Sequence, residues 1–377
     1  MEVRASEPHA WWMRISLALT CCLSMLAGCG GSTVAEDAGA DAAPVANDAG
    51  PGGDGGAHDA GASDGGGTDA GRDAGVITDG GTRSFRASYP LDARFPEGGI
   101  YDALRHRFYV GSLADGSVRR IDAETGEETT VFTETAPGLW WTLGMDIDPS
   151  TDRLYVCALE DRREEDVDPP YDGYVWVFDM ETGERIANHD LGAVSPDATC
   201  TDVAVAADGT VYVCDRENPR IYALSPAGEV SLLVEDALLE GGVIGQNALV
   251  VLPDQSALLS LVYLSSRLVY VRLSDGYAHE VNIEGDFSDR LPVLSGADGM
   301  TLDDGSVLVA FTSQLNRVTP ILADWSTAHA TTVDVPAGMT DVVQTPAGAY
   351  LLNGQAVSFA FDRETDPFAL VRFDGTL

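Results

Sequence analysis

The sequence contains no lysine, so every basic residue apart from histidine is an arginine. The absence of lysine excludes Schiff-base chemistry and the lysine of phosphate-binding loops. The basic residues number 22 against 60 acidic ones, which gives a net charge of −38. A chain this acidic offers no basic face to nucleic acid or to an anionic bilayer, so we expect no nucleic-acid partner and favour cations as ligands.

Two further absences narrow the function. The six histidines are scattered without the spacing of metal ligands, which argues against a histidine-based zinc centre. Beyond the first 29 residues we find no amphipathic helical pattern, only short β-rich runs separated by Asp-Gly, Thr-Gly and Pro-Asp turns. The pattern therefore predicts an all-β protein.

A lipoprotein signal is predicted at the start of the chain. Arg14 precedes an apolar run that ends in Leu26-Ala27-Gly28-Cys29, which indicates a signal peptide over 1–28 and a lipidated Cys29. Acyl chains would anchor the protein to a membrane without spanning it. Gly30 follows the cysteine where aspartate would retain a lipoprotein at the inner membrane, so by analogy we expect the bacterial cell envelope, at the outer membrane, periplasmic or surface-exposed.

A linker is expected to follow the anchor. Residues 29–84 are almost wholly Asp, Ala, Gly, Ser, Thr and Pro, with Asp-Ala-Gly repeated. Such a segment has too few apolar side chains to offset the entropy of ordering, which predicts a disordered tether. Three cysteines then remain in the folded part, Cys157, Cys200 and Cys214, which allow at most one disulfide. We expect mostly buried structural thiols, and the sequence leaves any disulfide pairing open.

A hairpin recurs six times between residues 85 and 377. The copies are Ile100–Asp102 with Phe108–Val110, Met145–Asp148 with Leu154–Val156, Val203–Val205 with Val211–Val213, Leu249–Val251 with Leu258–Ser260, Met300–Leu302 with Val307–Val309, and Val342–Gln344 with Tyr350–Leu352. Their spacing of roughly 50 residues is that of one four-stranded propeller blade. The last copy ends one strand short, and Phe85–Leu91 could supply that strand and close the ring. We therefore predict a single six-bladed β-propeller over 85–377.

The residues before each inner strand should line the central mouth. Among them, Glu97, Asn247 and Asp298 are expected to converge near the axis. Two carboxylates and an amide oxygen are hard donors, which suit Ca²⁺ or Mg²⁺ and tolerate Mn²⁺ or Zn²⁺. These positions predict a divalent-metal site, with Ca²⁺ first.

The chain resembles the regucalcin/gluconolactonase superfamily of six-bladed propellers, which also includes luciferin-regenerating enzymes. The resemblance covers residues 85–377 and rests on Pro96-Glu97-Gly98, Gln246-Asn247 and Asp298-Gly299-Met300. It implies that Glu97, Asn247 and Asp298 hold a divalent metal, that the metal polarises a lactone carbonyl, and that Asp298 is the catalytic residue that moves protons.

The chain departs from this family at the start of blade three. Lactonases of the family carry an Arg and an Asn there, whereas this sequence has Thr199-Cys200-Thr201-Asp202. Thr199 and Thr201 could hydrogen-bond a ligand in the pocket, and Asp202 could be a further metal ligand. The guanidinium that would grip a sugar is lost from this position, which weighs against an aldonolactone substrate.

Two local features are expected near the mouth. The charged loop 160–173 of blade two could be a lid, a second cation site through Asp166, Asp168 and Asp172, or a solvated loop. Trp140 and Trp141 precede the inner strand of blade two. We expect one of them to line the mouth and the other to pack between blades.

Two functions remain open at this point. The first is a metal-dependent hydrolase of lactones or related esters outside the cytoplasm. The alternative is a non-catalytic surface propeller that binds a protein, a glycan or a small ligand at its mouth. A quinone-dependent dehydrogenase is less favoured, because such propellers use histidine and basic residues that this sequence does not place before the inner strands.

Overall fold

The computed structural model describes residues 77–78, 83–135, 138–165, 167, 169–242, 244–287, 296–360, 363 and 367–377. They all belong to one compact unit, Asp73–Leu377. The predicted signal peptide 1–28, Cys29 and nearly all of the predicted linker lie outside the described residues, as do Asp166 and Asp168. Among the residues described, no helix has the length and apolarity needed to cross a membrane.

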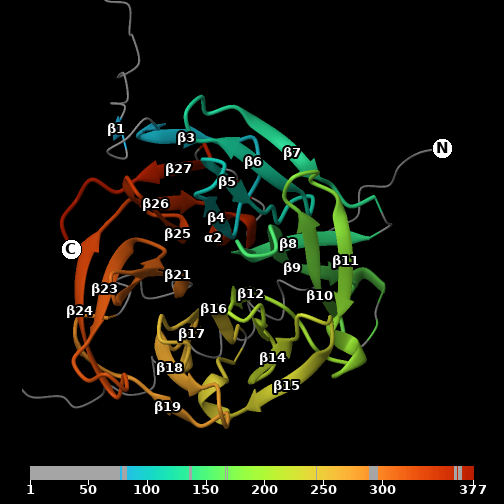
Figure 1. The fold of residues 1–377 in the computed structure, drawn as a ribbon, viewed down its shortest axis with the longest axis vertical. Helices are drawn as coiled ribbons and strands as arrows, with labels where there is room; N and C mark the ends of the chain where they lie inside the picture. The colour runs from blue at the N-terminus through green and yellow to red at the C-terminus, as the bar shows by residue number, and fades with distance from the viewer. Residues whose placement is uncertain are drawn as a thin grey trace, which may run out of the picture. The chain divides into compact units, whose positions relative to one another are not determined.

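Six antiparallel sheets are arranged around an axis, which confirms the predicted six-bladed β-propeller (Figure 1). Blades one to three consist of β4 (Gly99–Asp102), β5 (Arg107–Val110), β6 (Val118–Asp122) and β7 (Glu128–Phe132); β8 (Leu139–Asp148), β9 (Arg153–Asp161), β10 (Tyr171–Asp179) and β11 (Arg185–Asp190); and β12 (Asp202–Val205), β13 (Val211–Cys214), β14 (Arg220–Leu224) and β15 (Val230–Glu235).

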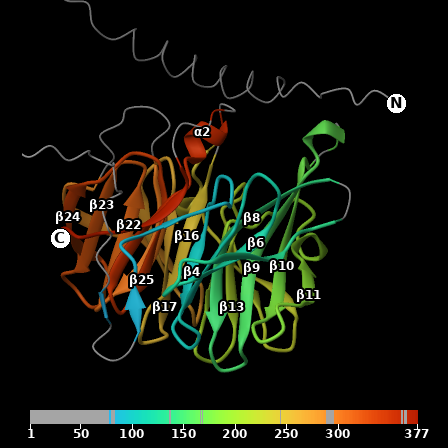
Figure 2. The same cartoon turned by 90° about the horizontal axis from the view of Figure 1, so that it is seen from above.

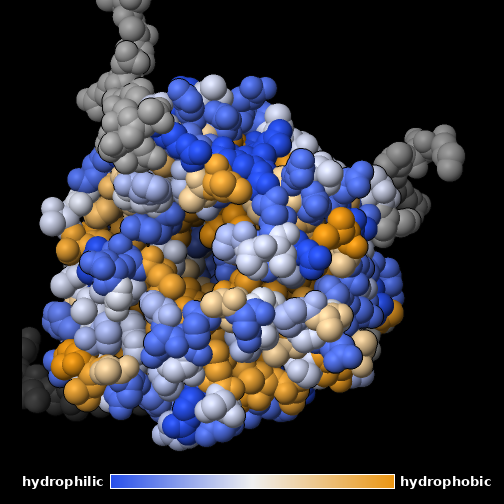
Figure 3. Space-filling view, in the orientation of Figure 1, coloured by the Kyte–Doolittle hydropathy of each residue, from blue (hydrophilic) through white to orange (hydrophobic). Residues whose placement is uncertain are grey.

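Blades four to six follow the same order from the axis outward. Their strands are β16 (Gln246–Val251), β17 (Ala257–Val262), β18 (Arg267–Arg272) and β19 (Ala278–Glu280); β21 (Ala297–Asp303), β22 (Ser306–Phe311), β23 (Gln314–Pro320) and β24 (Thr327–Asp334); and β25 (Met339–Thr345), β26 (Gly348–Asn353) and β27 (Ala369–Arg372). The space-filling view shows a hollow at the centre of the ring (Figure 3). A short helix, α2 (Ala356–Ala360), joins β26 to β27 on one face (Figure 2).

The ring is closed by a strand from the other end of the folded part, as predicted. Strand β3 (Ser88–Pro90) pairs antiparallel with β27 and completes blade six. A small two-stranded sheet, β1 (Ile77–Thr78) with β2 (Ser84–Phe85), precedes it. Blade five gains a fifth strand that the repeats do not predict, because β20 (Asn282–Gly285) lies parallel to β24 at its outer edge. Both additions cover strand edges that would otherwise stay unpaired.

The core lies between neighbouring blades and is rich in aromatic rings. Tyr89, on the closing strand, contacts Phe108 of blade one and Tyr350 of blade six, with ring centroids 5.1 and 5.7 Å apart. All three are fully or almost fully buried. The Tyr89 hydroxyl also donates to the Ala123 carbonyl at 2.6 Å. The closing strand is therefore held by burial of apolar area as well as by its ladder.

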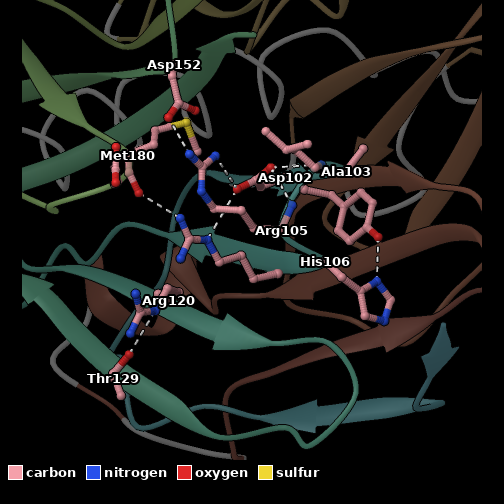
Figure 4. A network of polar contacts seen from close by, with 12 residues as sticks. Asp102, Ala103, Arg105, His106, Arg120, Thr129, Asp152 and Met180 are labelled. Atoms are coloured by element: carbon pink, nitrogen blue, oxygen red, sulfur yellow. Dashed lines mark hydrogen bonds and ion pairs between the residues drawn. The ribbon is translucent and has the colours of Figure 1, made fainter.

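On the face opposite the starts of the inner strands, a polar network ties blade one to blade two (Figure 4). Asp102 is 3% exposed and pairs with Arg105 and Arg107. Arg105 also pairs with Asp152, and the Arg107 guanidinium donates to the Met180 carbonyl at 2.8 Å. Arg105 and Arg107 thus each have partners in both blades, whereas Asp102 is paired within blade one.

A disulfide links blade two to blade three. Cys157 on β9 is bonded to Cys200, just before β12, and their Cα atoms lie 5.4 Å apart. Cys214 is a buried free thiol. The limit of one disulfide is met, and all three cysteines are buried as expected. Cys157 and Cys200 form a disulfide and are not thiols, because the closure of two neighbouring blades brings them together.

Candidate functional site

Irregular pairing at the start of the inner strands shapes the axial pocket. In blade four the register shifts between Gln246 and Ala248, so Asn247 is left out of the ladder. In blade five the shift falls between Ala297 and Met300, around Asp298. A β-bulge changes the direction of the side chains it contains. Here the bulged residues Asn247 and Asp298 line the pocket.

The pocket is partly open to solvent and has a cavity volume of about 20 Å³. That space suffices for a water molecule or an ion. Its lining includes all three predicted ligands and, from the start of blade three, Thr201 and Asp202. The full set is Glu97, Gly98, Gly144, Thr201, Asp202, Asn247, Ala248, Asp298, Gly299, Thr340 and Asp341.

Glu97, Asn247 and Asp298 form a buried acidic cluster. The amide of Asn247 donates to the Asp298 carboxylate and, at 3.3 Å, to the Asp298 carbonyl. The Glu97 Oε2 atom is buried and has no hydrogen-bond partner among the residues that the structure describes. Burial raises the pKa of Glu97 to about 7, against the effect of the Arg216 charge. Burial and the negative charges of Glu97 and Asp341 raise the pKa of Asp298 well above its usual value.

The residues present fit a divalent cation. The cluster offers two carboxylates and one amide, all oxygen donors that Ca²⁺ or Mg²⁺ accepts. The unpartnered Oε2 of Glu97 and the repulsion between Glu97 and Asp298 are both relieved by a positive charge placed between them. No group of three or more His, Cys, Asp or Glu side chains in the described part of the chain is placed to hold a metal. The predicted set of donors therefore includes the amide of Asn247 as its third member.

Asp202, the other carboxylate predicted as a ligand, links blade three to blade four. Its Oδ1 accepts from the Val203 N–H at 2.8 Å, and its Oδ2 accepts from the Leu249 N–H of blade four at 2.9 Å. Both oxygens thus bind backbone groups. In this arrangement Asp202 acts as an inter-blade staple, because it ties two inner strands together.

The same staple recurs at two other seams. Asp146 accepts from Ile147 and from Val205 of the next blade, at 2.7 and 2.8 Å. Asp341 accepts at the same two distances from Val342 and from Gly99. Burial raises the pKa of Asp146 to about 6 and that of Asp341 to about 7, while the backbone hydrogen bonds lower it. Two N–H donors per carboxylate offset much of the cost of burying the charge.

Close packing around the staples requires glycine. A Cβ atom on Gly144 would lie 2.0 Å from Asp202 Oδ1, and one on Gly299 would lie 2.0 Å from Asp341 Oδ1. Gly98 faces backbone, because a Cβ there would lie 2.5 Å from the Leu143 carbonyl oxygen. These glycines let the inner strands approach closely around the pocket.

The two predicted threonines have different surroundings. Thr201 lines the pocket, and its Oγ1 is buried without a hydrogen-bond partner. Thr199 is 1% exposed and does not line the pocket. Its hydroxyl donates to Asp215 at 2.5 Å and accepts from the N–H groups of Arg216 and Glu217 at 3.1 and 3.2 Å. Thr199 therefore fixes the turn that carries Arg216.

A guanidinium that does not line the pocket acts electrostatically on the acidic cluster. Arg216 follows β13 of blade three, and its charge lowers the pKa of both Glu97 and Asp298. The start of blade three has no arginine, but the loop between the second and third strands of the same blade carries Arg216. Such loops lie on the mouth face, and inspecting them together with the starts of the inner strands would have found Arg216.

Aromatic side chains accompany Arg216. Its guanidinium lies 5.7 Å from the ring centroid of Trp141, and that of Arg163 lies 5.3 Å from the same ring. Tyr171 and Phe359 of α2 also contact Trp141. As expected for one tryptophan of the pair, Trp140 packs in the core, against Tyr174 and Trp176. Both tryptophans belong to β8, which begins earlier than predicted.

The charged loop of blade two is shorter than its sequence suggests. Strands β9 and β10 extend into it, and η1 (Arg163–Glu165) begins the connection. Asp172 pairs with Arg162 at 2.8 Å, and Asp161 pairs with Arg163. Asp172, the one described member of the predicted second cation site, is thus neutralised by an arginine.

Comparisons with known proteins establish the fold. No family model matches the chain, and no curated protein matches its sequence. Among solved structures, the allergen Mala s 1 of Malassezia sympodialis is similar over 77% of this chain and 96% of its own (TM-score 0.64, 17% identity). A luciferin-regenerating enzyme is similar over 80% of this chain and 96% of its own, with a TM-score of 0.53 and 12% identity. A gluconolactonase of Xanthomonas campestris is similar over 76% of this chain and 88% of its own, with a TM-score of 0.52 and 15% identity. The predicted resemblance to the gluconolactonase superfamily is confirmed at the level of the fold.

Proposed function

We propose that the axial pocket binds a divalent cation at Glu97, Asn247 and Asp298, with Ca²⁺ first and Mg²⁺, Mn²⁺ or Zn²⁺ as alternatives, and that the protein hydrolyses lactones or related esters. The observation that carries the proposal is the contrast among the buried carboxylates. Asp146, Asp202 and Asp341 each accept two backbone N–H groups, whereas Glu97 Oε2 has no partner. A buried charge without a structural partner marks a functional site.

The residues have distinct roles in this proposal. A bound divalent cation supplies a Lewis acid that polarises the substrate carbonyl. Asn247 holds one oxygen of Asp298 through its amide, which leaves the second oxygen to accept a proton from the attacking water. The Thr201 hydroxyl, buried in the pocket without a partner, is free to bind a polar group of the substrate.

We further propose that this chemistry takes place outside the cytoplasm, at a membrane to which lipidated Cys29 anchors the chain. The disulfide between Cys157 and Cys200 supports an oxidising compartment, where such bonds persist. The predicted signal peptide over 1–28 points to the same location. The cell envelope would then supply the substrate.

The test combines metal analysis with turnover. The full-length protein is treated with a chelator, titrated with CaCl₂, MgCl₂, MnCl₂ or ZnCl₂ by calorimetry, and assayed at constant pH against aliphatic, aromatic and sugar lactones. We expect one cation to bind with one-to-one stoichiometry and to restore turnover lost on chelation. Asp298→Asn should abolish turnover, and the exposed Asp275→Asn should not change it. Unchanged turnover in Asp298→Asn overturns the proposal.

The alternative is a non-catalytic propeller that binds a ligand at its mouth. The small space open to a water molecule, about 20 Å³, favours it, because a lactone needs more room than the pocket now provides. Under this alternative the cation still binds, and Asp298→Asn weakens it, but no lactone in the panel is turned over.

A further inference from the structure

The Nε–H of Arg216 makes an ion pair but no hydrogen bond with the described residues. This group is buried. The carboxylate of Glu217 lies 3.7 Å from Nε, which is beyond hydrogen-bond distance. Only 14% of the Arg216 side chain is exposed, so water does little to replace the missing partner. A buried guanidinium donor left unpaired is costly, which suggests that a ligand pairs with it.

The backbone of Arg216 is held in place by its surroundings. Thr199 accepts the Arg216 N–H at 3.1 Å, and the Arg216 carbonyl accepts from Gly245 at the start of blade four, at 2.9 Å. Asp215, fully buried, binds the turn through Glu217 and Asn218. The guanidinium in turn stacks against Trp141. Such anchoring positions a binding group before the ligand arrives.

The charges around Arg216 favour an anion. A divalent cation would neutralise Glu97 and Asp298, and Arg216 would then add a positive charge next to them. Arg163, which also contacts Trp141, is paired with Asp161. The carboxylate of Glu217 is partly exposed and lies 3.7 Å from the Arg216 Nε atom. The planar fork of a guanidinium matches a carboxylate, which accepts two of its N–H groups, better than a single hydroxyl.

We propose that Arg216 is the substrate-binding guanidinium of this propeller and selects lactones or esters that carry a carboxylate over neutral ones. The inference rests on the proposed lactone or ester hydrolysis for its substrate class. Thr199 is a positioning residue, because it acts on the ligand only through Arg216.

The test uses binding, so that it does not depend on turnover. The full-length protein is titrated by calorimetry, with CaCl₂ present, with cyclopentanecarboxylate and with cyclopentanecarboxamide, a neutral compound of the same shape. We expect the carboxylate to bind at least about tenfold more tightly than the amide. Arg216→Gln should weaken carboxylate binding by about 10- to 100-fold and leave amide binding unchanged. Arg163→Gln, on the same tryptophan, should change both by less than about threefold.

Calcium affinity separates a binding role from a structural one. Loss of a positive charge near Glu97 and Asp298 should leave calcium binding by Arg216→Gln as tight as in the wild type or tighter. Equal binding of carboxylate and amide by the wild type, failure of both to bind, or an unchanged preference in Arg216→Gln overturns the inference. A protein that is inactive toward every lactone but shows the Arg216-dependent preference refutes the lactonase proposal alone.

Discussion

Removal of the disulfide between Cys157 and Cys200 should destabilise the propeller by a calculable amount. The two cysteines are 43 residues apart in sequence. For a loop of this length the chain-entropy relation gives about 4 kcal/mol at room temperature. Both side chains are fully buried, so replacing them with alanine also removes two packed sulfur atoms. We expect each to add about 1 kcal/mol.

The assay is unfolding in guanidinium chloride with and without a reductant. The Cys157→Ala/Cys200→Ala double variant should lose about 4 to 6 kcal/mol. If the free energy changes by about 6 kcal/mol per molar denaturant, the midpoint falls by roughly 0.7 to 1 M. Reductant should shift the wild type towards the variant and leave the variant unchanged.

Cys214→Ala is the matched control, because it removes one buried sulfur atom without breaking a cross-link. Its loss should be about 1 kcal/mol and independent of reductant. If the double variant loses no more than twice the loss of Cys214→Ala, the cross-link contributes nothing and the reasoning from loop length is refuted.

Three further predictions concern the axial region. Gly144→Ala should lower the unfolding free energy by about 1 to 3 kcal/mol, because its Cβ would displace Asp202. Gly99→Ala is the control, because its Cβ would meet only contacts of 3.3 Å or more, and its unfolding free energy should fall by less. Equal decreases in the two variants would contradict this account. Burial raises the pKa of Asp146 to about 6, so its carboxyl favours folding when protonated, and this contribution is lost as pH rises from about 4 through 6. As the pH rises from about 4.5 to 7, the unfolding free energy of Asp146→Asn should therefore increase by about 1 to 2 kcal/mol relative to that of the wild type, as measured by denaturant titration. A difference in unfolding free energy that does not change with pH would refute this. Glu97→Gln should lose cation binding in calorimetry. In the absence of metal, the variant should unfold at a higher temperature than the wild type, because it lacks the buried charge. A lower unfolding temperature would show that Glu97 supports the fold.

The blades could be predicted because each hairpin carries its own signals. Val211–Val213 was expected as the second strand of its hairpin, and β13 covers these residues, since β-branched side chains and the preceding Asp208-Gly209 turn define the strand locally. The missing strand of blade six pointed to ring closure, and β3 provides it. β20 could not be predicted in this way, because its pairing with β24 depends on where the chain passes between two finished blades.

Only those features of the site that follow from the order of the strands could be predicted. Glu97, Asn247 and Asp298 were expected to converge because each precedes an inner strand, and all three line one pocket. Asp202 had the same sequence signal as Asp298. What separates them is the partner each finds, since Leu249 of the next blade presents an N–H to Asp202. Such a contact depends on the angle between blades, which the sequence pattern does not specify.

The carboxylates near the axis differ in whether they bind backbone N–H groups, and this difference indicates which of them serve the fold. A propeller can hold its inner strands together with Asp146, Asp202 and Asp341, each of which uses both oxygens for backbone groups of two blades. Glu97 lines the pocket with Asp202 and Asp341, yet its buried Oε2 binds no group of the described residues, and its charge opposes that of Asp298. Stability alone would favour a neutral side chain in its place. The proposed cation would account for the acidic charge at this position, and the proposed anionic substrate would give the Arg216 Nε–H the hydrogen bond that it lacks among the described residues.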